Sequence, residues 1–87
     1  MVGGYTEDKQ SDETSQNLLN HHQNDIQTQL GIQYNNAQVV SYQTQVVAGT
    51  NYKIKAKTDD GKTFEVTIYK KLPHDGQVTS VTKAELV

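Results

Sequence analysis

The residues from about 50 to 71 constrain the fold most, because they predict two antiparallel β-strands joined by a tight turn. From residue 52 to 57, apolar residues alternate with lysines, which is the pattern of a strand with one buried face. Asp59-Asp60-Gly61 follows, and an Asp-Gly pair between two alternating segments is a strong hairpin signal. The hairpin must bury the face that carries Tyr52, Ile54, Ala56, Phe64, Val66 and Ile68.

The residues before this hairpin predict a single helix from about Asp12 to Gly31. Ser11 or Asp12 can cap its first turn, and a glycine such as Gly31 commonly ends a helix. Apolar side chains recur at helical spacing along one stripe, whereas Asn and Gln fill most of the opposite face. The stripe consists of Leu19, Ile26 and Leu30, with Leu18 and His22 beside them.

Four strands are expected after the helix, at about residues 38–47, 50–58, 62–71 and 78–86. The last of them alternates poorly, so the sequence does not assign its buried face. An amphipathic helix needs an apolar surface to cover, and a meander of strands with one apolar face provides it. We therefore expect an α+β fold in which an antiparallel β-sheet wraps around a single α-helix. It forms one domain over residues 1–87, in which residues 1–11 are a mobile N-terminal arm.

The composition argues against several classes of partner. The chain has 87 residues and a net charge of −2, and it lacks the dense basic stripe that neutralises nucleic-acid phosphates. No stretch approaches the ~20 apolar residues of a membrane-spanning helix. There is no cysteine, and the first residues contain neither the basic segment nor the apolar stretch of a signal peptide. We expect a cytoplasmic protein that binds neither nucleic acid nor a membrane.

The sequence contains no recognisable catalytic or metal-binding constellation. A hydrolase needs a nucleophile held beside a base, but the serines lie in no nucleophile motif. Adjacent helical residues point about 100° apart, so His21 and His22 do not form a metal clamp, and His74 lies alone in a turn. No glycine-rich phosphate loop precedes the helix. We therefore expect no enzymatic activity, no cofactor and no metal.

The turn between the first two long strands, Gln45–Gly49, has an unusual composition. Hairpin turns are normally polar, yet this one carries Val46 and Val47. If they are buried, the two valines belong to the core; if they are exposed, they form an apolar patch that requires a partner. Gly49 permits backbone geometry closed to other residues and lets another surface approach closely.

Two further segments have both a structural and a functional interpretation. Pro73 fixes a turn between the last two strands, and an exposed Leu72-Pro73 pair would extend the same apolar edge. Gly3-Gly4 is either an untethered terminus or a flexible joint in the arm.

These three segments together resemble the inhibitory edge of the cystatins, which inhibit papain-like cysteine proteases. Gln45, Val47 and Gly49 fill the fixed positions of the family's Q-x-V-x-G motif. Gly3-Gly4 lies near the start and Leu72-Pro73-His74 late in the chain, at the places where the family has its N-terminal glycine and its second hairpin loop. In lacking cysteine and therefore disulfides, the chain resembles the stefin type of cystatin. The resemblance covers nearly the whole chain and implies the cystatin-like fold.

The resemblance also implies a mechanism, in which the three segments form a wedge that reversibly and competitively occludes the active-site cleft of C1-family, cathepsin-type proteases. Gly3 takes the role of the arm's glycine, with Gly4 as the alternative. The strained Val46–Gly49 turn suggests that the monomer can exchange into a domain-swapped dimer. The alternative function is that of a non-inhibitory binding or structural module with the same fold. The implied protease-binding residues are Val2, Gly3, Gly4, Gln45, Val46, Val47, Ala48, Gly49, Leu72, Pro73 and His74.

Overall fold

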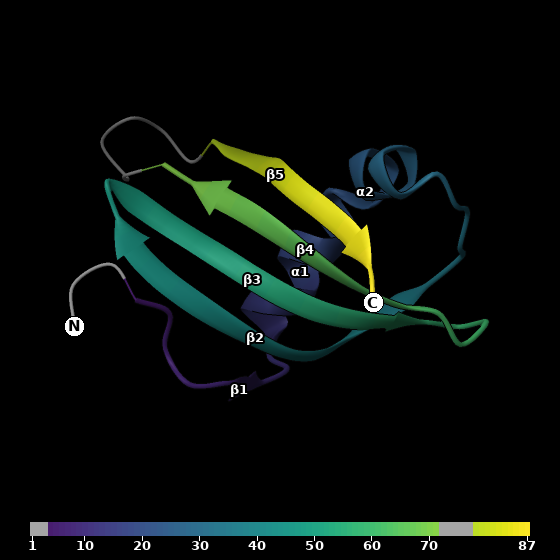
Figure 1. The fold of residues 1–87 in the computed structure, drawn as a ribbon, viewed down its shortest axis with the longest axis horizontal. Helices are drawn as coiled ribbons and strands as arrows, with labels where there is room; N and C mark the ends of the chain where they lie inside the picture. The colour runs from purple at the N-terminus through teal and green to yellow at the C-terminus, as the bar shows by residue number, and fades with distance from the viewer. Residues whose placement is uncertain (1–3, 72–77) are drawn as a thin grey trace.

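The fold is a five-stranded antiparallel sheet with two helical segments on one of its faces (Figure 1). The computed structural model describes residues 4–71 and 78–87. The strands are neighbours in sequence order, β1-β2-β3-β4-β5, and every pair is antiparallel. The expected α+β fold, in which an antiparallel sheet wraps around the helical region, is confirmed. The elements are β1 (Lys9–Gln10), α1 (Glu13–His21), α2 (Gln23–Leu30), β2 (Ala37–Val47), β3 (Gly49–Thr58), β4 (Thr63–Lys70) and β5 (Thr79–Leu86).

The helical region begins and ends where the sequence predicts. The Asp12 carboxylate accepts a hydrogen bond from the Ser15 amide at 2.8 Å, and the Asp12 amide donates to the Ser15 hydroxyl oxygen in return, which forms a capping box. Gly31 has a φ of 71°, and this left-handed conformation ends α2. The start and the stop therefore arise from local sequence chemistry.

The single predicted helix is interrupted at His22. Its backbone, with φ −101° and ψ 16°, leaves helical geometry and separates α1 from α2. The break lets α1 pack on β2 and β3 while α2 packs on β5. In Figure 1 α1 accordingly lies behind the sheet, whereas α2 lies beside β5 and points in a different direction.

The core lies between the helical segments and the apolar face of the sheet. Ile54, Ala56, Phe64, Val66 and Ile68 are fully buried, as the alternating pattern predicts, whereas Tyr52 at the end of the sheet is only partly buried. The remaining buried apolar residues are Leu19, Ile26, Tyr34, Ala37, Val39 and Tyr42.

Two β-bulges explain where the alternation fails. Val40 has no partner between the Val39 and Ser41 pairs of β2, and Thr82 has none between Val81 and Lys83 in β5. A bulge shifts the side-chain alternation by one residue. In β5 it places Val81 and Ala84 against the core although they are three positions apart. The irregular pattern of this strand therefore has a structural cause.

A hydrogen bond ties the start of α1 to β2. The Tyr42 hydroxyl donates to the Asp12 carboxylate, which already caps the helix. This bond lowers the pKa of Asp12 and raises the pKa of Tyr42 to about 12. One carboxylate therefore fixes the helix against the second strand.

A second polar contact ties the helix break to the last strand. The His22 ring is buried, and its Nε2 lies 2.7 Å from the Thr79 hydroxyl. Burial lowers the pKa of His22, the neighbouring His21 lowers it further, and the Asp25 carboxylate 3.8 Å away opposes the shift. The neutral imidazole is therefore the form that the fold favours.

We expect stability to fall on acidification because of His22. Its pKa in the folded chain lies below the ordinary value of 6.5, so the unfolded chain binds the proton more readily. The contribution is complete above about pH 6.5 and is lost as the pH falls toward the folded-state pKa. His22→Gln should cost about 1–2 kcal/mol at pH 7.5 and flatten the dependence between pH 7.5 and 5.5. His21→Gln is the control, because His21 is exposed. This variant should keep most of the pH dependence of the wild type. Urea unfolding at each pH measures the free energy of unfolding of both variants. If this free energy depended on pH in His22→Gln as it does in the wild type, His22 would not be the source of the pH dependence.

Candidate functional site

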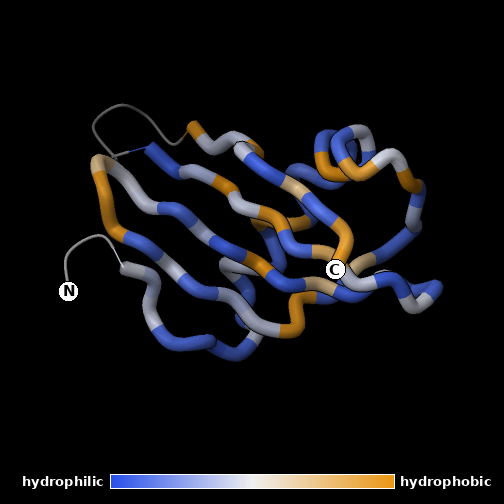
Figure 2. Tube along the Cα trace, in the orientation of Figure 1, coloured by the Kyte–Doolittle hydropathy of each residue, from blue (hydrophilic) through white to orange (hydrophobic). Residues whose placement is uncertain are grey.

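An exposed apolar tip stands at one end of the sheet, where β2 turns into β3. Ala48 is the only residue between the two strands, and we call Val46, Val47 and Ala48 the valine tip. Val46 is 72% exposed and Val47 is 44% exposed, so neither valine belongs to the core. Figure 2 shows this hydrophobic segment at the end of the sheet farthest from α2. Of the two sequence-based alternatives, the structure has the exposed one.

Gly49 is required by the geometry of this turn. Its φ of 125° lies in a region that other residues rarely adopt. A Cβ atom built on it would lie 2.5 Å from the Lys70 carbonyl oxygen and 2.7 Å from the Tyr69 hydroxyl. The glycine therefore allows both the turn and the close packing of β4 against it.

Tyr69 is a component of this region that sequence reasoning missed. It lies near the end of β4, and its hydroxyl donates a hydrogen bond to the carbonyl of Ala48. Tyr69 pairs with Asn51 across the sheet, on the face opposite the core residues Ile68 and Val66. The available signal was an aromatic residue at an outward-facing strand position.

Gln45 lies in the stem of the hairpin below the valine tip. It is paired with Asn51 across the β2–β3 ladder, and the Asn51 amide donates to the Gln45 side-chain oxygen at 2.9 Å. Cross-strand hydrogen bonds of this kind stiffen a hairpin. Gln45 therefore supports the valine tip from beneath.

The N-terminal segment runs beside the outer part of β2. The Thr6 amide donates to the Thr44 carbonyl at 2.9 Å, and the Thr44 amide donates to the Thr6 hydroxyl at 3.1 Å. The Lys53 Nζ atom lies over the Tyr5 ring, 5.5 Å from the ring centroid. Gly4 is exposed, and the described segment before β1 runs along β2 toward the end of the sheet that carries the valine tip (Figure 1). The predicted mobility of residues 1–11 stays a prediction, and Val2 and Gly3 lie outside the described residues.

The predicted second loop consists of Leu72, Pro73 and His74, which also lie outside the described residues. Its flanks are described. Lys70 pairs with Thr50 at the start of β3, and the Lys71 amide donates to the Val78 carbonyl at 3.0 Å. Both flanks therefore lie at the same end of the sheet as the valine tip.

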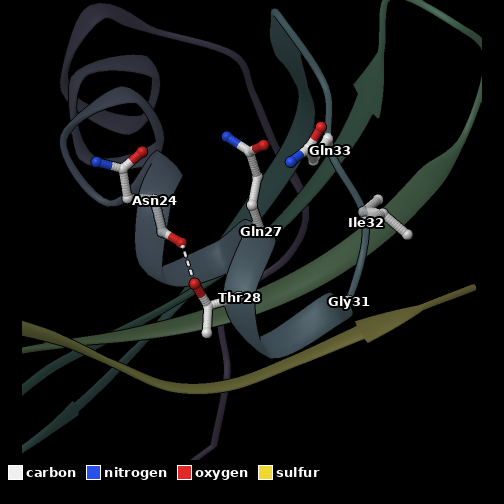
Figure 3. A pocket seen from close by; sticks show the side chains of 6 residues that line it. All are labelled: Asn24, Gln27, Thr28, Gly31, Ile32 and Gln33. Carbon is white, nitrogen blue, oxygen red and sulfur yellow. Dashed lines mark hydrogen bonds between the residues drawn. The ribbon is translucent and has the colours of Figure 1, made fainter.

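A pocket of about 640 Å³ lies beside the end of α2, away from the valine tip (Figure 3). Its polar lining consists of neutral side chains, and the Thr28 hydroxyl donates to the Asn24 carbonyl at 2.9 Å. None of the lining residues ionises, so the pocket offers no acid, base or activated nucleophile. The lining residues are Asn24, Gln27, Thr28, Gly31, Ile32 and Gln33.

Over residues 4–71 and 78–87, no three His, Asp or Glu side chains gather closely enough to hold a metal ion. Within the same described part of the chain, no helix is both long and apolar enough to span a membrane.

Comparison with known proteins identifies the family. The family model of the cystatin domain matches residues 3–85. The chain is 38% identical to Cystatin-A2 of Dictyostelium discoideum over 93% of its own length and 82% of the relative's. It is 34% identical to human Cystatin-A over 84% of its length and 74% of the relative's. It is also 28% identical to Leukocyte cysteine proteinase inhibitor 1 of Sus scrofa, over 85% and 72% respectively.

The domain match spans nearly the whole chain, and it includes the strands and the turn that form the valine tip. The chain therefore belongs to the cystatin family, among its stefin-type members.

Proposed function

We propose that this chain is a reversible, competitive-type inhibitor of papain-like (C1 family) cysteine proteases of the cathepsin type. Cystatins are inhibitors and not enzymes, and the pig relative is named for inhibiting cysteine proteinases. The observation that carries the proposal is the exposed valine tip, where two apolar side chains protrude from a well-supported hairpin. An exposed apolar patch of this kind requires a partner.

The proposed mechanism is occlusion of the active-site cleft. The valine tip enters the cleft, with the segment around Gly3 and Gly4 on one side and the Leu72-Pro73-His74 loop on the other. None of the three presents a peptide bond correctly to the catalytic cysteine, so the inhibitor is not cut. Binding one valine fully in a dry cleft contributes about 1.5–3 kcal/mol, so a few residues dominate the affinity.

The sheet lowers the entropic cost of this binding. The hairpin stem below the valine tip is paired residue by residue from Val46 with Thr50 down to Tyr42 with Ile54. A contact surface that is ordered before binding loses less conformational freedom when the complex forms. Cytoplasmic localisation is part of the proposal, because a chain without cysteine folds without an oxidising compartment.

The valine tip is tested by Val47→Asp. A carboxylate placed in a dry cleft without a partner should weaken papain inhibition by several kcal/mol, roughly 100-fold or more. The free protein should melt at nearly the same temperature, because Val47 is exposed. Val40→Asp is the matched control, since Val40 is a 53% exposed valine in the β2 bulge, and it should inhibit normally.

Two outcomes of this titration would contradict the proposal. Equal loss of inhibition in Val40→Asp and Val47→Asp would separate inhibition from the valine tip. A wild-type chain that inhibits neither papain nor cathepsin-type enzymes would instead favour the alternative, a binding or structural module without a protease target.

The arm is tested by deleting residues 1–4. The deletion leaves the Thr6 and Thr44 contacts in place, so the melting temperature should not change. Inhibition should weaken by about 1–3 kcal/mol, which corresponds to a few interface contacts. Inhibition constants of the two forms measure the effect. An unchanged constant would remove the arm from the mechanism.

The oligomeric state is tested by mild heating. We propose a monomer in which the Val46–Gly49 turn can open, so that β2 and β3 form one continuous strand in a domain-swapped dimer. Two β-branched residues in a tight turn favour this opening. The dimer loses the valine tip, so it should not inhibit papain. Size-exclusion chromatography with an assay on each peak decides, and a fully inhibitory dimer would refute the link between this turn and protease binding.

A further inference from the structure

We propose that Tyr69 is a positioning residue that fixes the backbone of the valine tip in its binding conformation. The inference rests on the proposed function, because it assigns the support of the same protease-binding surface. Tyr69 belongs to β4, which is not part of the hairpin that carries the valine tip. Its side chain nevertheless reaches the turn, where the hydroxyl donates to the Ala48 carbonyl.

The hydrogen bond is made to Ala48, the one residue of the turn that is not paired in the β2–β3 ladder. Val47 pairs with Gly49 across the β2–β3 ladder, and Ala48 between them has no partner in it. The Tyr69 hydroxyl supplies a partner to this carbonyl. The orientation of the peptide between Ala48 and Gly49 is thereby set by a side chain from the neighbouring strand.

Gly49 makes this contact possible. A Cβ at position 49 would lie 2.9 Å from the Tyr69 ring carbon Cε1 and 2.7 Å from its hydroxyl oxygen. Real Cβ atoms do not approach other atoms this closely, so any other residue at position 49 would displace the tyrosine. Gly49 and Tyr69 therefore act as a pair, in which the missing side chain of one accommodates the ring of the other.

The pair also involves the end of β4, after which the chain continues into the predicted second loop. Tyr69 directly precedes Lys70, whose carbonyl oxygen would lie 2.5 Å from a Cβ at position 49. The end of β4 therefore packs against the turn at both residues, Tyr69 at Ala48 and Lys70 at Gly49. Because the chain continues from β4 toward Leu72, a fixed β4 end also sets where the second loop begins.

Tyr69→Phe tests the inference, because it removes the hydroxyl and keeps the ring. We expect papain inhibition to weaken about threefold to tenfold, the loss associated with one hydrogen bond. The melting temperature should change little. Tyr52→Phe is the matched control. Tyr52 lies at the same end of the sheet, and its hydroxyl makes no hydrogen bond within the described residues. Its inhibition should equal that of the wild type.

Two readouts separate positioning from a general structural role. Amide hydrogen exchange of the free protein should accelerate at residues 46–49 in Tyr69→Phe and stay unchanged in the core strands. In addition, Val47→Ala should cost less inhibition in the Tyr69→Phe background than in the wild type, because Tyr69 acts through the valine tip. Additive losses would mean that Tyr69 acts independently of the valine tip, and the inference would fail.

The two proposals can fail separately. If the wild-type chain inhibits papain but Tyr69→Phe inhibits equally well, the proposed function stands and the positioning role is refuted. If the wild-type chain does not inhibit, the proposed function fails, and the exchange measurement alone decides whether Tyr69 fixes the turn. Unchanged exchange at residues 46–49 would then refute the inference.

Discussion

The structure depends on the burial of one apolar face of the sheet beneath the two helical segments. Leu19 and Ile26 from the helices pack into the same cluster as Ile54, Phe64 and Ile68 from the strands. Burial of each such side chain contributes about 1.5–3 kcal/mol, which is a large share of the stability of a small domain. The helices cover only part of the sheet, and its end at the β2–β3 turn extends beyond them (Figure 1). That end is consequently free to present apolar side chains to a partner.

The uncovered end is held by polar contacts and by a glycine rather than by the core. The valine tip is stiffened by the Gln45–Asn51 pair below it and by the Tyr69 contact with Ala48 beside it. Hydrogen bonds at an exposed site contribute little net stability, but they reduce the number of conformations that a turn can adopt. The surface that we assign to protease binding can therefore be ordered without being buried.

Much of the fold could be predicted because local chemistry determines it. The Asp12 cap, the Gly31 stop and the alternating residues of β3 and β4 all act over short distances in the chain. The break at His22 could not be predicted, because its ring contacts Thr79 from the far end of the sequence. The bulges at Val40 and Thr82 depend on strand register. The exposure of the valine tip stayed open for the same reason, and the role of Tyr69 appears only when β4 is folded against Gly49.

Amide hydrogen exchange of the chain alone and in complex with papain tests the central claim most directly, because it reports which surface the protease covers. The account predicts strong protection at residues 46–49, further protection in residues 1–4 and 72–74, and little change on the Asn- and Gln-rich face of the helices. Protection confined to that helical face or to the pocket beside α2, with unchanged exchange at residues 46–49, would contradict it.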